Sequence, residues 1–342
     1  MNSPESTRLF VQGCGAVSPA GWGAGALKSA VAQGNTLPVT PLENPAGSLL
    51  EVRRVPPPPS RPAVLAHPRL RRSSLISQFA CAAAREALDA AGFQGSDRSR
   101  WGVVCTVMGG SVTYSRRFYA EVLAQPSTAS PLLFPETVFN APASHLAAVF
   151  GLTGPCDTLV ADQTGFLSGL AVAADWLVRG AVDRCLVVAA EEADWSSAEA
   201  HRLFDPQTPT AEGAGALCLS RDPSPVELRF ITDPELYTHR RTQAAAAERV
   251  RGQCPAEFLE ASWLQSPPLA EPPEATLHGS LGALGDGLAA VGAWTCVTAV
   301  RRILDGHAAR IGVHIHGANL QSMAAGFAAS GLSHHGPLLA PI

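Results

Sequence analysis

The chain has 342 residues, a length that favours two domains or one duplicated domain over a single small core. Hydrophobic residues make up 46% of the chain and charged residues only 16%, which fits a protein that covers part of its surface with another subunit. The net charge is −4 and the sequence has no long basic run, so composition argues against a nucleic-acid partner.

In the first 220 residues, short apolar strands alternate with helices. In chain order we expect a strand at 9–12, a helix at 24–32, an extended surface loop over the proline-rich residues 38–68, a helix at 79–91, a buried strand at 101–108, a helix at 140–150, a strand at 158–161, a buried helix at 164–179, and strands at 185–190 and 214–219. This alternation predicts an α/β fold with largely buried, mixed sheets.

The remainder of the chain repeats the plan more weakly. We expect a strand near 257–261, a helix at 288–304 and a strand at 310–315. Residues 221–256 are polar and irregular by comparison, so the domain boundary is placed at their start. The sequence therefore predicts two parts, residues 1–220 and residues 221–342.

Cysteine and histidine spacing does not indicate a metal site. The eight cysteines have neither metal-ligand spacing nor paired regularity, and we interpret them as reduced core thiols. His314 and His316 alternate on a predicted strand and share one face, so a metal pair is one reading. No third ligand lies at a suitable spacing, and a hydrogen-bonded pair is the favoured interpretation. We expect no metal and no cofactor.

No segment predicts a membrane protein. The most apolar stretch, Phe166–Val178, contains Asp175 and is too short to span a bilayer. Residues 1–10 are polar and lack the charged-then-apolar build of a signal peptide. We expect a cytoplasmic protein.

Several segments resemble the β-ketoacyl-carrier-protein synthases. Residues 13–21, GCGAVSPAG, resemble the opening of that family, and residues 72–110 follow its pattern of helix, strand and double glycine. Further landmarks are Phe134-Pro135, Asn140, Gly154-Pro155, residues 212–216 and Gly317-Ala318-Asn319. The resemblance covers nearly the whole chain and is most specific in the N-terminal half. It implies a thiolase-like fold, layered α-β-α-β-α, built from two related halves, of which the second is shortened.

The family joins acyl units by decarboxylative condensation, which requires a cysteine nucleophile at the start of a buried helix and two histidines in the same pocket. In the family the cysteine lies eight residues after the Gly-Pro landmark, and Gln163 stands there in this chain. A carboxamide cannot carry a thioester. The resemblance therefore implies that acyl transfer through this position is lost.

The two family histidines also have no counterpart. Residues 261–267 are the best match to the first histidine segment, with Ser262 at the histidine and Trp263 at a glycine that leaves room for the phosphopantetheine arm. We expect Trp263 to narrow or close that channel. Residues 285–292 match the second segment and put Asp286 at the histidine, while another register puts Ala283 there. Ile315 replaces the phenylalanine of the family's gating loop.

This pattern resembles the chain length factors, catalytically inactive homologues that pair with an active ketosynthase in type II polyketide or fatty-acid-type systems. The resemblance implies that residues after the double glycine reach over the dimer interface and line the partner's acyl tunnel. Here these are Val112, Tyr114 and Phe118, with Phe134 and Phe139 nearby. We expect no condensing activity from the chain alone, and an acyl carrier protein is a further expected partner.

Two alternatives remain open. One is a malonyl-thioester decarboxylase with glutamine at the nucleophile position, a reading that the absence of both family histidines disfavours. The other is a homodimeric binding protein derived from a synthase. The sequence does not separate a heterodimer from a homodimer, because both use the same interface in this family.

Overall fold

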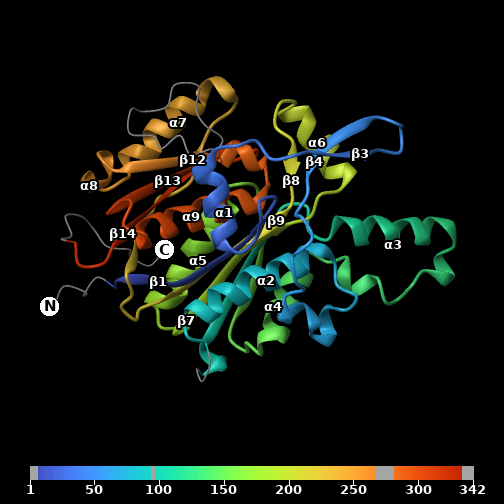
Figure 1. The fold of residues 1–342 in the computed structure, drawn as a ribbon, viewed down its shortest axis with the longest axis horizontal. Helices are drawn as coiled ribbons and strands as arrows, with labels where there is room; N and C mark the ends of the chain where they lie inside the picture. The colour runs from blue at the N-terminus through green and yellow to red at the C-terminus, as the bar shows by residue number, and fades with distance from the viewer. Residues whose placement is uncertain (1–6, 94–96, 267–280, 333–342) are drawn as a thin grey trace.

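The computed structural model describes residues 7–93, 97–266 and 281–332 (Figure 1). The elements of the first part are β1 (Leu9–Ser18), β2 (Gly21–Trp22), α1 (Ala24–Gln33), β3 (Thr40–Glu43), β4 (Leu49–Arg53), α2 (Leu75–Ala90), β5 (Trp101–Val107), α3 (Val112–Ala124), α4 (Ala141–Phe150), β6 (Cys156–Val160), α5 (Gly165–Val178), β7 (Arg184–Glu191), α6 (Trp195–Phe204), β8 (Thr210–Ala211) and β9 (Gly213–Ser220). The elements of the second part are β10 (Val226–Ile231), β11 (Glu235–Leu236), α7 (Arg240–Gly252), α8 (Ala256–Leu259), β12 (Ser262–Ser266), α9 (Ala289–Leu304), β13 (Arg310–His316) and β14 (Gln321–Ala329).

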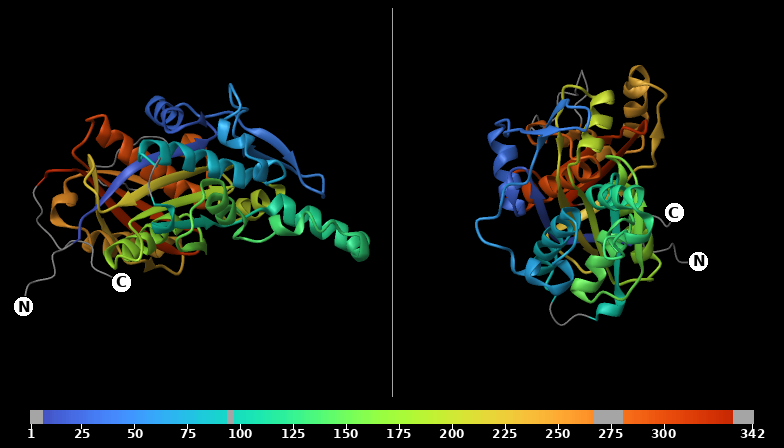
Figure 2. Two further views of the ribbon diagram at one scale, coloured as in Figure 1. Left: turned by 90° about the horizontal axis from the view of Figure 1, so that it is seen from below. Right: turned by 90° about the vertical axis from the view of Figure 1, so that its right-hand side faces the viewer.

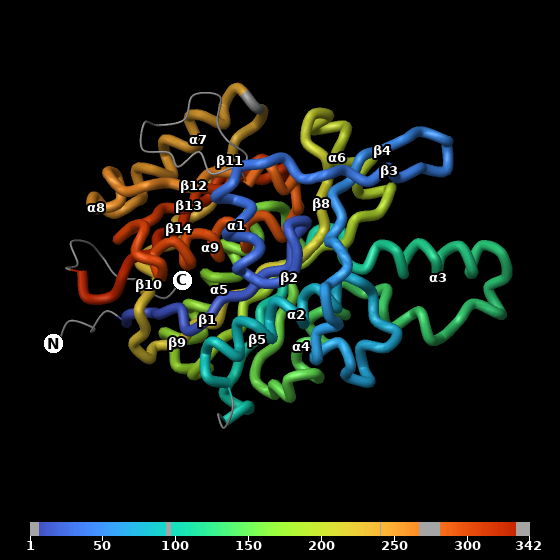
Figure 3. Tube along the Cα trace, viewed as in Figure 1, coloured from blue at the N-terminus to red at the C-terminus, as the bar shows by residue number. Residues whose placement is uncertain are grey.

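The strands form one continuous mixed sheet across both parts of the described chain. Its order is β12-β13-β14-β10-β1-β9-β7-β5-β6, with β2 beside β1 and β11 beside β14. Strands β1 and β10, which are far apart in sequence, pair antiparallel and join the two parts (Figure 3). A second, small sheet contains β3, β4 and β8.

Successive side chains of the strands point into different cores, and the helices of these cores form three layers. On β7, Leu186 and Val188 face a core that contains α2 and α4, whereas Val187 and Ala189 face the core that contains α5 and α9. Strands β13 and β14 contribute to the same α5–α9 core from its other side, and α7 packs on the outer face of β14. Helices α5 and α9 therefore lie between the two parts of the sheet, and the predicted α-β-α-β-α layering is confirmed.

The order of elements repeats along the chain. In the first part β5 and β7 are parallel, and β7, β9 and β1 follow as antiparallel neighbours. In the second part β12 and β13 are parallel, and β13, β14 and β10 follow in the same way. The proposed boundary after residue 220 falls between β9 and β10. Because the two parts share the α5–α9 core, neither buries that core alone.

The structure corrects several sequence predictions. Residues 221–256 are not irregular, because they contain β10 and α7. Over residues 241–252, helix α7 buries only Ala246, Ala247 and Val250, too few apolar positions for a clear helical pattern. The strand expected at 257–261 is the short helix α8 followed by β12, and the loop expected at 38–68 contains the β3–β4 hairpin.

Two elements extend from the body of the molecule. Helix α3 projects to one side, with every residue at least partly exposed, and the β3–β4 hairpin extends in the same general direction (Figures 1 and 2). The sequence analysis did not predict α3, because a helix with no buried residue has little apolar periodicity to detect.

Candidate functional site

Gln163 lies in the tight turn between β6 and α5, at the amino end of a buried helix. Its side chain is buried, as are those of Asp162 and Thr164 on either side. The Asp162 carboxylate accepts hydrogen bonds from the Thr164 backbone N–H at 2.9 Å and from the Thr164 hydroxyl at 2.7 Å. These bonds fix the turn and hold Gln163 at the position that a helix-start nucleophile would occupy.

The Gln163 carboxamide is held in one orientation by two hydrogen bonds. Its Nε2 donates to Asp286 Oδ2 at 2.8 Å, and its Oε1 accepts from the Ala318 backbone N–H at 2.8 Å. Asp286 precedes α9, and Ala318 lies between β13 and β14, so three distant segments meet at this side chain. A carboxamide bonded in this way is a structural connector and offers no nucleophile.

His201 joins the same cluster. Its Nε2 lies 2.9 Å from Asp286 Oδ2, and the Leu288 backbone N–H donates to Asp286 Oδ1 at 2.7 Å. Burial alone would lower the pKa of His201, but the hydrogen bond and charge of Asp286, together with the charge of Asp205, raise it above its usual value. The pair therefore stabilises a protonated imidazole beside Gln163. Sequence reasoning missed His201, for which the α6 sequence provides no family motif.

The cluster forms part of the wall of a cavity of about 700 Å³. The polar lining includes Gln163, His201, Asp286, His316 and Asn319. Apolar lining comes from Met108, Phe204, Leu288 and Leu320. Leu288 has a φ of 50°, a left-handed backbone conformation that is strained for leucine. It directly precedes α9, and its backbone N–H donates to Asp286 Oδ1.

His314 and His316 form the hydrogen-bonded arrangement expected from their spacing. His314 Nε2 lies 2.8 Å from the Ser322 hydroxyl, which lies 3.0 Å from His316 Nδ1. Burial lowers the pKa of His316 to about 4 and holds that of His314 well below its usual value. Although His316 is one of the cavity-lining residues, its Nε2 is buried and has no hydrogen-bond partner in the described part of the chain.

Asp162 fixes the opposite wall. Besides its bonds to Thr164, it accepts from the Asn319 backbone N–H at 2.7 Å and from Gln321 Nε2 at 3.1 Å. A side chain at Gly317 would collide with the Asp162 carboxylate, so the loop that follows β13 requires glycine there. The Ala318 backbone N–H in this loop donates to Gln163. Two neighbouring residues, Asp162 and Gln163, therefore both hold the loop by hydrogen bonds.

Comparisons with known proteins agree with this geometry. Residues 64–223 match the family "Beta-ketoacyl synthase, N-terminal domain", and no curated protein matches the sequence. Among solved structures, the ishigamide ketosynthase/chain length factor is 20% identical over 95% of this chain and 100% of that one, with a TM-score of 0.78.

Two further structures superpose over most of the chain. One is a type II PKS acyl-carrier protein in complex with its ketosynthase, AntDE:AntF, at 16% identity, with 95% of this chain and 99% of that one covered and a TM-score of 0.75. The other is the ketosynthase ApeO with its chain length factor ApeC from Xenorhabdus doucetiae, at 13% identity, 96% and 100% coverage and a TM-score of 0.72. The chain has the fold of these ketosynthase structures, and residues 64–223 match the N-terminal domain of the β-ketoacyl synthases.

Of the three positions that the resemblance assigns to the family's catalytic residues, two meet in this structure and the third does not. Gln163 and Asp286 are directly bonded, although they are 123 positions apart. The alternative register is less consistent with the site, because Ala283 is buried in a short 3-10 helix and does not line the cavity.

Ser262 lies away from the cluster. It is the first residue of β12 and pairs with Ile311, whereas the cavity lies beyond the other end of β13, at His316. Five residue steps along β13, from Ile311 to His316, separate these two levels, roughly 17 Å at the usual rise per residue. Strand β12 ends at Ser266, which is the end nearer the cavity. The sequence match therefore puts the family's histidine position at the far end of the strand. Residues 267–280 lie outside the described residues.

Trp263 and Ile315 are core residues. The Trp263 indole packs over Gly312 and donates to the Phe258 carbonyl at 3.0 Å, in the core on the outer face of the sheet. Ile315 is fully buried in the α5–α9 core. Neither side chain lines the cavity at Gln163, so Trp263 does not close it and Ile315 does not gate it.

The predicted tunnel residues gather around α3. Val112 opens the helix, the Tyr114 hydroxyl donates to the Arg72 carbonyl at 2.7 Å, and the rings of Phe118 and Phe134 lie 5.7 Å apart. Phe139 lies over Gly110, where an added Cβ would collide with its ring. Sequence reasoning missed the exposed apolar residues between them, which are Tyr119, Leu123, Leu132 and Val138.

The remaining expectations concern cysteines, metals and membranes. All eight cysteines fall in the described ranges and are free thiols; seven are buried and Cys156 is exposed. In residues 7–93, 97–266 and 281–332, no three potential ligands are grouped to hold a metal ion. No helix in that part of the chain has both the length and the apolar character needed to cross a bilayer.

Proposed function

We propose that this chain is a non-catalytic, chain-length-factor-like partner of an active ketosynthase in type II polyketide or fatty-acid-type biosynthesis. The observation that carries the proposal is a group of exposed apolar side chains, here called the α3 face, on α3, on the segment that follows it and on the edge strand β6. It contains Tyr119, Leu123, Leu132, Phe134, Val138, Phe139 and Val160. A monomer rarely leaves so many large apolar side chains in water, and such patches mark protein interfaces.

An edge strand adds a second feature of an interface. Strand β6 is the terminal strand of the sheet and pairs only with β5 within the described residues, so its outer edge presents unpaired backbone groups. Cys156, Asp157 and Val160 on this strand are exposed. Strand addition by a partner would satisfy these groups and extend the sheet across two subunits.

The chemistry of the cavity supports a non-catalytic role. Gln163 occupies the position that the resemblance assigns to the nucleophile. Its Nε2 and its Oε1 are both engaged in hydrogen bonds within the chain. Two hydroxyl groups belong to residues that line the cavity, and both donate to backbone carbonyls: Ser197 to Asp194 at 3.0 Å and Tyr237 to Gly317 at 2.8 Å. No side chain identified at this site is prepared to form a thioester.

We propose that the pair Phe118 and Phe134, with Phe139, Val112 and Tyr114, forms the floor of the partner's acyl tunnel. Two of the neighbouring structures contain a chain length factor, and one contains an acyl carrier protein with its ketosynthase. The same assembly, with an acyl carrier protein delivering substrate in the cytoplasm, is the proposal for this chain. Large side chains at this floor would stop an acyl chain by steric exclusion.

A second candidate function is supported by one specific observation. His201, His239 and His316 line the same cavity as Gln163, so the chain has three imidazoles there although the resemblance puts no histidine at the two family histidine positions. Hydrogen bonds from imidazoles to a malonyl thioester would stabilise the enolate that remains when the carbon–carbon bond breaks and carbon dioxide leaves. The test is carbon dioxide release from malonyl carrier protein by the isolated chain, which His201→Ala should abolish if this function is present.

The main proposal is tested by co-expression with an intact ketosynthase encoded nearby, followed by sizing and a condensation assay with malonyl carrier protein. We expect a one-to-one complex whose products lengthen when Phe118 or Phe134 is replaced by alanine. Leu203→Ala, at an exposed leucine at the end of α6, is the matched control and should leave product length unchanged. A stable homodimer that neither binds nor alters any synthase would instead favour a homodimeric binding protein.

A further inference from the structure

Helix α6 forms a wall of the cavity and is held with few apolar contacts. Ser197, Ala200, His201 and Phe204 line the cavity, and their spacing places them on one helical face. Of the ten residues of α6, only Ala198 and His201 are buried. A helix with so little buried surface depends on its polar attachments for its position.

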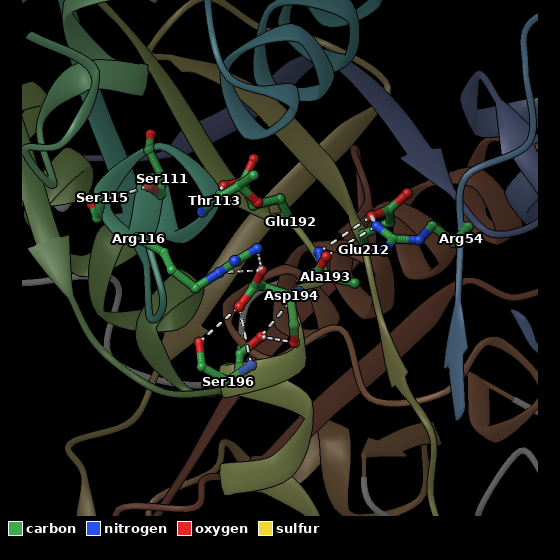
Figure 4. A network of polar contacts seen from close by, with 11 residues as sticks. Arg54, Ser111, Thr113, Ser115, Arg116, Glu192, Ala193, Asp194, Ser196 and Glu212 are labelled. Carbon is green, nitrogen blue, oxygen red and sulfur yellow. Dashed lines mark hydrogen bonds and ion pairs between the residues drawn. The ribbon is translucent and has the colours of Figure 1, made fainter. Parts of the chain in front are cut away.

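The first attachment is shared with α3. Asp194 caps α6, with Oδ1 accepting from the Ser196 backbone N–H at 3.0 Å and from the Ser196 hydroxyl at 2.9 Å. Its Oδ2 accepts from Arg116 of α3, at 3.2 Å from Nε and 2.8 Å from Nη2. Figure 4 shows this single carboxylate between the two helices, with the Arg116 side chain extended toward it.

A neighbouring attachment of α3 does not involve α6. The Thr113 backbone N–H donates to Glu192 Oε1 at 2.8 Å, and the buried Glu192 follows directly after β7 (Figure 4). The start of α3 is therefore tied to the sheet. One helical turn later, Arg116 bonds to the α6 cap, and its guanidinium lies over the Trp195 ring of α6 at 5.9 Å.

The second attachment of α6 is at its other end. His201 is bonded to Asp286, which is bonded to Gln163, and Gln163 receives the Ala318 backbone N–H. A displacement of α6 would separate His201 from Asp286 and change the wall of the cavity on the side opposite the 317–320 loop. The cap and the histidine thus link the α3 face to the cavity through one short helix.

We propose that α6 is a movable wall of the cavity whose position is set by the Arg116–Asp194 ion pair, so that a protein packed on α3 controls access to the cavity. The identity of that protein rests on the proposed function, whereas the link between Arg116 and the cavity does not. A partner that holds Arg116 against Asp194 closes the wall, and one that draws Arg116 away opens it.

The link is tested in the isolated full chain by hydrogen exchange of residues 195–204 and by carbethoxylation of His201 with diethyl pyrocarbonate. Arg116→Ala should speed both by roughly three- to tenfold, the effect of losing a partly exposed ion pair and weakening a helix cap. The matched control is Arg117→Ala, whose ion pair with Glu121 stays within α3 and which should behave as wild type. The exposed His307, which does not line the cavity, is the internal reference for reagent activity.

Exchange of residues 184–191 in β7 separates a local effect from general unfolding. Wild-type exchange of 195–204 in the Arg116→Ala variant would overturn the proposal, and so would equal acceleration in β7. Arg116→Lys, which keeps the charge and loses the two-nitrogen contact, should give an intermediate rate and provides a second variant if alanine impairs folding.

Addition of the co-expressed ketosynthase then tests the coupling in the complex. We expect protection of residues 112–124 together with a changed exchange rate in 195–204. If 112–124 gain no protection, the proposed partner role fails while the Arg116 result stands. If 112–124 are protected and 195–204 exchange as before, the coupling through α6 is refuted and the partner role stands.

Discussion

The cavity cluster and the α3 face differ in how completely their side chains are satisfied. Around Gln163, buried polar groups are bonded to one another across 123 positions of sequence, and Asp286 accepts three hydrogen bonds. On the α3 face, by contrast, Leu123 is 68% exposed and Phe134 is 56% exposed. The polar side chains around Gln163 find their hydrogen-bond partners within this chain. The apolar side chains of the α3 face would be buried only when another surface covers them.

This difference separates the contacts that hold the fold together from the surface that would meet another subunit. The positions assigned to catalytic residues now hold the β6–α5 turn, the approach to α9 and the β13–β14 loop together. The surface that would meet another subunit retains its large apolar side chains. Substitutions in the two regions should therefore have different consequences. Those in the cavity cluster should lower the stability of the chain, and those on the α3 face should weaken its association with a partner.

The largest expected effect is at Asp162, in the self-contained region. Asp162→Ala leaves the N–H groups of Thr164 and Asn319 without their acceptor and should lower the free energy of unfolding by about 3–5 kcal/mol. Chemical denaturation measures the loss. The exposed Asp157 is the control, and Asp157→Ala should change stability by less than about 0.5 kcal/mol. Equal effects at the two positions would contradict the contrast between interior and face.

The next effect concerns the α3 face. The double substitution Leu123→Ser and Phe134→Ser should weaken binding to the partner synthase by roughly a hundredfold or more, as expected for interface anchors, with little change in the stability of the isolated chain. Isothermal titration calorimetry or sizing measures the affinity. Leu203→Ser is the matched control, since Leu203 is 73% exposed and lies on α6. Unchanged affinity in the double variant would remove this face from the interface.

The third prediction concerns acid stability. Burial depresses the pKa of His316 to about 4, below its usual 6.5, so the neutral form stabilises the fold. That stability is fully present above about pH 6.5 and is lost as the pH falls through 4, up to about 3 kcal/mol for this one group. His316→Gln should flatten the acid limb of a melting-temperature profile. An unchanged acid limb would show that His316 is not buried as the structure describes.

The smallest effect is expected at His201, whose pKa is raised by Asp286 despite burial. Its contribution to stability is present below the usual pKa of histidine and is lost as the pH rises through the raised value. Asp286→Asn should lower the pKa of His201 and cost about 1 kcal/mol near neutral pH. Histidine NMR titration follows the shift, and an unmoved His201 resonance would exclude Asp286 as its partner.

The sequence was sufficient for the fold class. It assigned Gln163 and Asp286 to positions of the family's catalytic residues, but it did not predict the hydrogen bond that joins them, and it gave no sign that Ser262 lies away from this pair. His201 and Asp162 could not be recognised, because their importance depends on contacts with segments more than 80 residues away. Helix α3 was missed because none of its residues is buried, so its sequence has little apolar periodicity to detect.

The most direct test of the central claim is a condensation assay with the reconstituted pair, in which each region of this chain is altered in turn. A cavity variant, Gln163→Ala with His201→Ala, should support condensation within about threefold of wild type once the folded fraction is measured, because the reacting groups belong to the partner. The α3-face variant, Leu123→Ser with Phe134→Ser, should lose condensation together with the complex. Full condensation by the face variant and none by the cavity variant would contradict the account and place chemistry in this chain.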